Sequence, residues 1–259
     1  MSSYFDQLTE PLLVQSYSIL FFISFVLGLV IMVSSGYGFS RRASMDEVAI
    51  QSAHKGFVPR VGGLAVYTSI LGLIPLLSFG FIPLSVVFDL NVEDLSLLIL
   101  SALPVFFVGL AEDLGYAMSP RIRLAASAIA SLLTLIMFKV WITKLGILGI
   151  DIMLLFPPFA IIFTVFATVG VVNAFNLIDG LNGFSSYITV SIAAALSIIA
   201  FQVGNIQITI FLVLLIAAVL GFMILNFPLG KIFLGDGGAY VLGHLLVWSA
   251  ILLINFENN

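Results

Sequence analysis

Acidic residues stand next to long apolar runs at three places in this sequence. Glu112 and Asp113 follow one apolar run, Asp179 follows another, and Asp236 precedes a third. Carboxylate oxygens are hard ligands that suit Mg²⁺ or Mn²⁺, and Mg²⁺ is typically bound by one or two carboxylates together with substrate phosphates. The four carboxylates therefore predict phosphate chemistry supported by a divalent metal ion.

The segment NAFNLIDGLNG, residues 173–183, places amide side chains around one of these carboxylates. Its three-residue repeat consists of Asn173, Asn176, Asp179 and Asn182. Neighbours in such a row share one face of a helix, but over the whole row an α-helix would drift, so we expect the helix to end near Gly180. A simple turn is the alternative interpretation, because Asn, Asp and Gly are also common in turns for reasons of backbone conformation.

Glycines and basic residues near the carboxylates are candidate contacts for a phosphorylated substrate. Gly235, Gly237 and Gly238 surround Asp236. Glycines let the backbone approach a ligand closely, so that amide groups there could hold phosphate oxygens. Positive charge that could pair with phosphates comes from Lys55, Arg60, Arg121 and Arg123.

The composition is that of a membrane protein. Of 259 residues, 61 % are hydrophobic and only 8 % are charged, which leaves too little polar surface for a soluble domain. The net charge of −4 does not suggest a nucleic-acid partner. The chain has no cysteine, which excludes disulfides and thiolate metal sites.

The uncharged runs are long enough to cross about 30 Å of hydrocarbon and predict about eight transmembrane helices. Their approximate ranges are 17–34, 61–82, 95–111, 122–138, 152–172, 184–203, 207–226 and 239–254. The start, MSSYFDQLTE, lacks the basic region of a cleavable signal peptide, so the first run is kept as a span. We expect a single all-α integral-membrane domain over residues 1–259.

The basic residues indicate how the predicted bundle is oriented. One side holds Arg41, Arg42, Lys55, Arg60, Arg121, Arg123 and Lys231, and the other side holds Lys139 and Lys144. By the positive-inside rule the first side is cytoplasmic, and both ends of this chain then lie outside the cytoplasm. All the polar segments named above fall on the cytoplasmic side. Metal, phosphate and membrane together point to phosphoryl transfer that involves a lipid phosphate.

Four motifs resemble, in order, those of the polyprenyl-phosphate N-acetylhexosamine-1-phosphate transferases. They are PRVGG, the acidic pair, NAFNLIDGLNG and FLGDGGAY. The resemblance covers nearly the whole chain and implies transfer of a sugar 1-phosphate from a UDP-N-acetylhexosamine to undecaprenyl phosphate, with release of UMP and a requirement for Mg²⁺. It also implies a bacterial inner-membrane enzyme that starts a lipid-linked glycan such as O-antigen or capsule.

The resemblance also implies roles for individual residues. The candidate catalytic residues, near the lipid phosphate, are Glu112 and Asp113. The metal-binding positions are Asn176 and Asp236. The nucleotide contacts are Asp179 and Asn182, and Lys55 stands near the uracil end. The sequence does not indicate which sugar is used or how Glu112 and Asp113 divide their roles, and a homodimer is compatible with it.

The chain departs from the family pattern at three points. The acidic pair is usually Asp-Asp, whereas here it is Glu112-Asp113. Asn182 replaces a usual aspartate, which makes the muramyl-pentapeptide branch a poorer match. The family ordinarily continues with two more helices and a loop rich in histidine and arginine, so we expect this chain to lack them.

Other protein classes fit the sequence less well. A transporter should carry its functional carboxylates near the bilayer midplane, whereas the acidic residues here stand at span ends. A CDP-alcohol phosphotransferase should have an arginine soon after Asp-Gly, and DGLNGFSSY has none. A scaffold, or an inactive or truncated family member, is a further alternative. His244 is predicted to be a buried, hydrogen-bonded histidine without a catalytic role.

Overall fold

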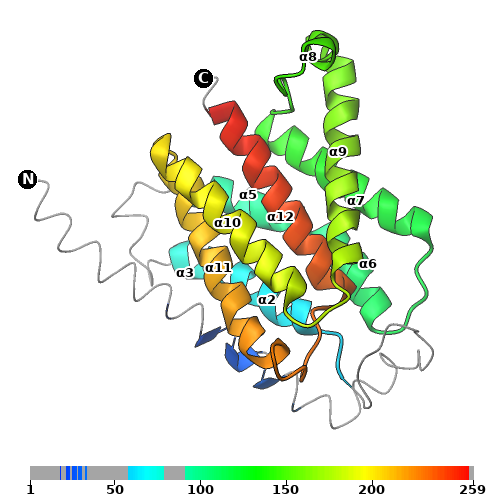
Figure 1. The fold of residues 1–259 in the computed structure, drawn as a ribbon, viewed down its shortest axis with the longest axis vertical. Coiled ribbons are helices and arrows are strands. Elements are labelled where there is room, and N and C mark those ends of the chain that lie inside the picture. Colours follow the sequence, from blue (N-terminus) through cyan, green and yellow to red (C-terminus); the bar gives the residue numbers. More distant parts are fainter. Residues whose placement is uncertain are drawn as a thin grey trace, which may run out of the picture.

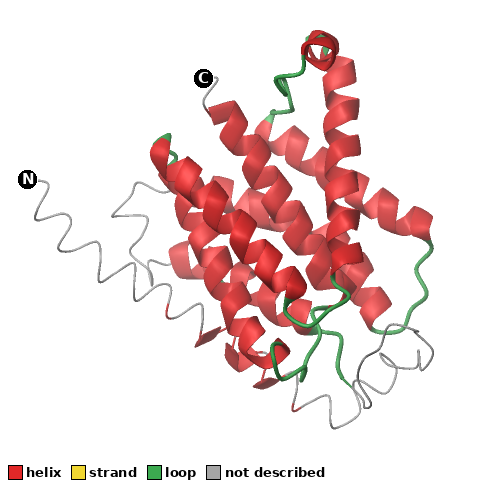
Figure 2. Cartoon of the chain, viewed as in Figure 1, coloured by secondary structure: helices red, strands yellow, loops and turns green. Residues whose placement is uncertain are grey.

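The structure, a computed structural model, describes residues 58–78 and 91–256 continuously, and scattered positions between 18 and 33. The described part is all-helical and contains no strand (Figure 2), which confirms the predicted fold class. In chain order the helices are α2 (Gly62–Leu71), α3 (Leu73–Ser78), α5 (Val92–Ser101), α6 (Leu103–Asp113), α7 (Pro120–Phe138), α8 (Leu148–Leu154), α9 (Pro157–Ile178), α10 (Phe184–Gln202), α11 (Ile206–Asn226) and α12 (Gly235–Phe256).

Six described stretches are long and apolar enough to cross a membrane. One is Val92–Asp113, in which α5 and α6 follow each other with a turn at Ala102, and the others are α7, α9, α10, α11 and α12. They correspond to six of the eight predicted spans. The predicted span 61–82 is described only as far as Ser78, and most of 17–34 lies outside the described residues, so the count of eight stays a prediction.

Helix α9 differs from its predicted span of 152–172. It begins at Pro157, because proline lacks the N–H that the first turn leaves unused and its φ suits that position. At the other end the helix runs on to Ile178, since amide side chains such as Asn173 and Asn176 do not interrupt it. The expectation that it ends near Gly180 is confirmed.

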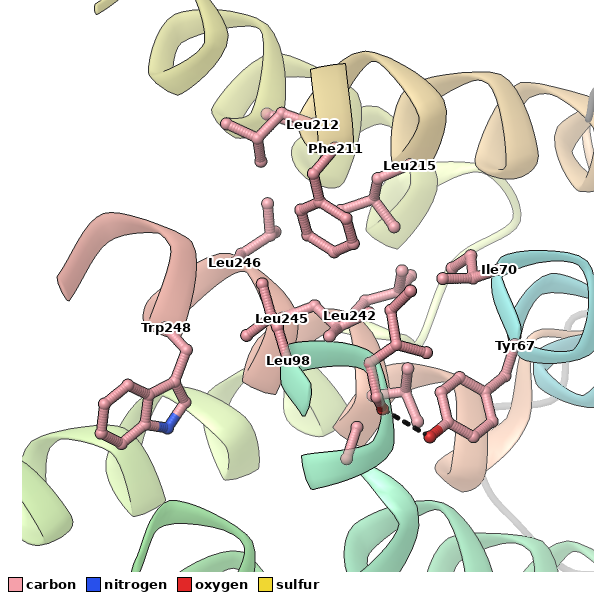
Figure 3. Packing of buried hydrophobic residues seen from close by; sticks show 14 of the residues in the cluster. Tyr67, Ile70, Leu98, Phe211, Leu212, Leu215, Leu242, Leu245, Leu246 and Trp248 are labelled. Atoms are coloured by element: carbon pink, nitrogen blue, oxygen red, sulfur yellow. Dashed lines mark hydrogen bonds between the residues drawn. The ribbon is translucent and has the colours of Figure 1, made fainter. Parts of the chain in front are cut away.

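Helix α12 is the central element of the bundle (Figure 1). In α11 and α12, 67 % of the apolar stretch is buried, against 22 % in α9. A helix that is apolar and buried all round lies inside a bundle, whereas the exposed apolar side chains of α9 suit lipid. Figure 3 shows Leu242, Leu245 and Leu246 of α12 packed between side chains of α2, α5 and α11.

A small polar network crosses this apolar interior. His244 is fully buried, and its Nε2 lies 3.0 Å from the Ser101 hydroxyl and 3.2 Å from the Thr134 hydroxyl. The contacts join α12 to α5 and α7 in the middle of the bundle. The structure therefore confirms that His244 is buried and hydrogen-bonded.

Candidate active site

The candidate site lies at one end of the bundle, where the last turns of α6 and α9 meet the first turn of α12. In Figure 1 these turns come together at the lower end of the molecule. The acidic pair ends α6, NAFNLIDGLNG runs from α9 into the loop before α10, and Asp236 lies in the first turn of α12. The fold therefore brings three of the sequence motifs together, from positions more than 100 residues apart.

Asp113 is turned into the protein and binds the start of α12. Its Oδ1 accepts a hydrogen bond of 2.8 Å from the Asp236 amide, and its Oδ2 accepts one of 2.9 Å from the Gly237 amide. The first amides of a helix have no partner within the helix, and negative charge is favourable there. Asp113 is only 4 % exposed. Its carboxylate is thus a cap for α12.

The glycines near Asp236 let helices approach one another. A Cβ built on Gly109 of α6 would lie 2.5 Å from the backbone of Gly237, and one on Gly63 of α2 would lie 2.2 Å from the Gly238 nitrogen. Gly235 has a φ of +78°, which favours glycine. Gly237 and Gly238 are buried, so in this structure they serve packing, and contact between these glycines and substrate stays a prediction.

Asp236 and Asn176, the two predicted metal-binding residues, are in direct contact. The Nδ2 of Asn176, in the last turns of α9, donates a hydrogen bond to Oδ1 of Asp236. Asp113 holds the Asp236 backbone from α6 at the same time. The Asp236 carboxylate is therefore positioned by two other helices.

Asp179 lies just beyond the end of α9 and accepts a hydrogen bond of 2.6 Å from the Ser185 hydroxyl. The pKa of Asp179 is raised from 3.8 to about 7, mainly by burial and to a smaller extent by the negative charge of Asp236. The Ser185 hydrogen bond and the positive charge of Arg60 act in the opposite direction but are weaker. Asp179 therefore titrates near neutral pH and shares its surroundings with Arg60 and Asp236.

Glu112, the other member of the acidic pair, faces a different partner. Its Oε1 lies 3.5 Å from the Arg123 guanidinium of α7, and Tyr240 of α12 also hydrogen-bonds to Arg123. The Oε2 of Glu112 and the Nε of Arg123 are buried and have no hydrogen-bond partner among the described residues. Buried polar atoms are normally satisfied, so both groups have capacity for a ligand.

The remaining candidates are spread around this cluster. Arg60 is exposed, and its carbonyl oxygen packs against Gly235. Asn182 lies in the loop between α9 and α10. Asn173 points toward α7, where its Nδ2 contacts the Ser127 hydroxyl at 3.4 Å, and it also donates to a backbone oxygen of its own helix. Lys55 lies outside the described residues.

Sequence reasoning did not single out three further polar residues of this region: Ser185, Asn226 and Tyr240. Asn226 accepts a 2.6 Å bond from the Gly183 amide and donates a 2.8 Å bond to the Ile232 oxygen, which joins the two loops that border the site. Tyr240 follows Asp236 by four residues, one helical turn, and that spacing could have indicated it. No sequence signal pointed to Ser185 or to the loop contact.

The donor groups fit a magnesium ion that completes its coordination with substrate. Among the described residues, no group of three or more His, Cys, Asp or Glu side chains is arranged to hold a metal by itself. Mg²⁺ is usually bound by one or two carboxylates, with waters and substrate phosphates as its other ligands. Asp236, with Asn176 and Glu112 near it, is a donor set of this kind.

A cavity of about 280 Å³ lies at the opposite end of the bundle and contains none of the candidate residues. It is bordered by the start of α5, the end of α7 and the end of α12, through Asp94, Phe138 and Asn255 among others. The polar cluster and this cavity are therefore separate features of the molecule.

Fold and cluster together define a polytopic membrane protein of the helical-bundle class. Residues 95–254 match glycosyl transferase family 4, and the chain belongs to this family. The match begins in α5 and ends in α12, so it contains the acidic pair, NAFNLIDGLNG and Asp236.

Named relatives come from several bacteria. The undecaprenyl-phosphate alpha-N-acetylglucosaminyl 1-phosphate transferase of Escherichia coli (strain K12) is 28 % identical over 208 residues, which are 79 % of this chain and 53 % of that protein. The protein of the same name from Yersinia pestis is 25 % identical over 83 % of this chain and 56 % of its own. The phospho-N-acetylmuramoyl-pentapeptide-transferase of Streptococcus pneumoniae (strain 70585) is 30 % identical over 81 % of this chain and 64 % of that protein. The chain spans about half the length of the first two.

Proposed function

We propose that this chain transfers an N-acetylhexosamine 1-phosphate from a UDP-sugar to undecaprenyl phosphate. The observation that carries the proposal is the Asp236–Asn176 contact, which lies beside Asp179, Glu112 and Arg123 at one end of a membrane bundle. The names of all three relatives denote transferases, and two of them are named undecaprenyl-phosphate alpha-N-acetylglucosaminyl 1-phosphate transferase.

In the proposed reaction an oxygen of the lipid phosphate attacks the phosphorus that is bonded to the sugar. A new phosphorus–oxygen bond forms, the bond between that phosphorus and the bridging oxygen of the diphosphate breaks, and UMP leaves. The second pKa of a phosphate monoester is about 6, so the lipid phosphate is largely deprotonated at neutral pH. A strong general base is not required, and the protein's main contribution is to position two anionic reactants.

Asp236 and Asn176 would hold Mg²⁺, or Mn²⁺ in its place. When bound, the ion would offset repulsion between the anionic reactants and stabilise the charge of the leaving UMP. Glu112 is close enough to Asp236 for their charges to interact.

The basic residues would bind the phosphates of both substrates. The Nε of Arg123 is buried and has no hydrogen-bond partner among the described residues, and guanidinium groups suit phosphate oxygens geometrically. Arg60 adds exposed positive charge beside Asp179. The Asp179–Asn182 loop borders the site and is the proposed nucleotide contact, together with Lys55.

The proposed setting is the bacterial cytoplasmic membrane. The polar cluster lies at helix ends, so a lipid phosphate could reach it from the inner leaflet while the UDP-sugar arrives from the cytoplasm. The product would start a lipid-linked cell-envelope glycan such as O-antigen, capsule or a related polymer. The orientation rests on the positive-inside rule.

The test is an assay of the purified protein with undecaprenyl phosphate, Mg²⁺ and individual UDP-N-acetylhexosamines. We expect UMP release that depends on the lipid, with one phosphate retained on the sugar. Glu93→Gln is the matched control, because Glu93 is exposed at the opposite end of the bundle. Release of UDP would indicate transfer at the sugar carbon, and movement of UDP-sugar across vesicles without UMP release would indicate a transporter. Either result would overturn the proposal.

A further inference from the structure

We propose that Asp113 is a positioning residue that holds Asp236 in place, and that Glu112 is the member of the acidic pair that faces substrate. The inference rests on the proposed function, since it divides roles within that site. The two carboxylates are neighbours in sequence, but they form hydrogen bonds or ion pairs with different groups: Asp113 accepts from backbone amides of α12, and Glu112 pairs with Arg123 of α7.

The Asp113 carboxylate is enclosed by the start of α12. Each of its oxygens accepts a hydrogen bond from one backbone amide. A Cβ built on Gly235 would lie 2.6 Å from both oxygens. A Cβ on Gly237 would lie 3.4 Å from Oδ2. Because the backbone of α12 occupies the space in front of the carboxylate, a substrate phosphate has no room to reach it.

This contact determines where Asp236 lies. The amide that donates to Asp113 Oδ1 belongs to Asp236 itself, so the bond fixes the backbone from which the Asp236 side chain extends. Asn176 then holds the carboxylate end. Functional groups must be held within about 0.5 Å of their productive geometry by the residues that support them. Asp113 supplies that support from α6.

Glu112, unlike Asp113, has access to solvent and a carboxylate oxygen that could still accept a hydrogen bond. It is partly exposed, and its Oε2 has no hydrogen-bond partner among the described residues. The guanidinium of Arg123 lies 3.5 Å from Oε1 of Glu112, and its Nε has no hydrogen-bond partner in the described part of the chain. A carboxylate and a guanidinium with unused capacity are suited to a phosphorylated ligand, alone or with a cation between them.

The first experiment compares capping with non-capping replacements at position 113. Asn and Ser can each accept an amide hydrogen bond at a helix start, whereas Leu cannot. We expect Asp113→Asn and Asp113→Ser to lose activity by about 10–100-fold, the range typical of residues that support a metal ligand, with kcat affected more than KM. The Mg²⁺ concentration for half-maximal activity should rise, and Asp113→Leu should be less active than either.

Glu112→Gln is the comparison within the pair. It should raise the KM for undecaprenyl phosphate. The Mg²⁺ concentration that it needs for half-maximal activity should be closer to that of the unmodified chain than in the Asp113 variants. If Asp113→Asn and Asp113→Ser are as inactive as Asp113→Leu and do not respond to Mg²⁺, then the carboxylate itself acts on substrate and the positioning role is wrong.

A second measurement needs no substrate. Hydrogen–deuterium exchange of the peptide that contains residues 235–238 should be faster in Asp113→Asn and unchanged in Glu112→Gln. Unchanged exchange in Asp113→Asn would overturn the proposal. If the unmodified protein releases no UMP but the exchange result holds, the proposed function fails while the positioning role stands. If Asp113→Leu does not fold, the comparison of Asp113→Asn and Asp113→Ser with Glu112→Gln still tests the positioning role of Asp113.

Discussion

At the scale of single residues, the carboxylates of the site differ because their surroundings differ. Asp113 is buried against amides, Glu112 pairs with Arg123, Asp179 accepts from a serine hydroxyl, and Asp236 contacts an asparagine amide. Burial, opposite charge and hydrogen bonding each shift the balance between the protonated and charged forms. Identical functional groups can therefore carry separate roles within one cluster.

The first prediction concerns Asp236. Asp236→Asn preserves shape but removes the charge that binds a hard cation. We expect UMP release to fall by more than about 100-fold, beyond the loss typical of a residue that only supports a metal ligand, and extra Mg²⁺ should restore it poorly. Near-normal activity at ordinary Mg²⁺ would remove Asp236 from the proposed metal site.

The second prediction concerns Asp179 and pH. Its pKa is about 7 in the folded protein and near 3.8 when unfolded, so between these values the folded state holds a proton that the unfolded state has lost. The free energy of unfolding should therefore fall with rising pH in this window, by up to about 1.4 kcal/mol per pH unit, and level off above pH 7. Asp179→Asn removes this dependence.

The measurement is chemical unfolding in detergent from pH 4.5 to 8, for the unmodified chain and Asp179→Asn. The difference between them isolates residue 179, because the other titrating groups are common to both. The variant should gain stability relative to the unmodified chain as pH rises. A constant difference across the range would show that the pKa of Asp179 is not raised.

At the scale of elements, the site depends on close backbone contact between helices. Gly63 of α2 and Gly109 of α6 each lie against a glycine of α12, and Asn226 joins the loops on either side of the site. Small residues let membrane helices pack closely, where the hydrophobic effect contributes little between them. The first turn of α12 is thus held in position by contacts with several elements.

The third prediction uses two glycines in helices. Gly109→Ala would place a methyl group 2.5 Å from the backbone of Gly237, so α6 and α12 must separate at a cost of about 1–3 kcal/mol. Gly170→Ala on α9 meets nothing within 4 Å and should stabilise the helix by about 1 kcal/mol. Thermal unfolding in detergent, followed by tryptophan fluorescence, measures both. Equal effects of the two substitutions would contradict the packing role of Gly109.

At the scale of the whole molecule, the polar cluster and the cavity near Asp94 lie at opposite ends of the bundle. Opposite ends of membrane helices face opposite sides of the membrane. The positive-inside rule predicts that the cluster faces the cytoplasm, because most basic residues lie on its side, and this orientation stays a prediction. A cytoplasmic location is required for the proposed reaction, since UDP-sugars are the donors.

The fourth prediction tests this orientation. The chain has no cysteine, so single cysteines can be introduced without other changes. Lys144 and Lys231 are both exposed, in loops at opposite ends of the bundle. An impermeant thiol reagent added to intact cells should label Lys144→Cys and not Lys231→Cys, and both should react once the cells are opened. The reverse pattern would invert the proposed topology.

The sequence by itself determined the helical membrane fold, the approximate helix ends and the location of the four candidate carboxylates at helix ends, because hydropathy and helix period are local properties. Tertiary structure decided which partners those residues meet. Glu112 and Asp113 are adjacent on a helix and point about 100° apart, so only the packing of α6 against α12 sets which one is buried. The contacts of Ser185, Asn226 and Tyr240 join distant segments in the same way, and their partners follow from how the helices pack.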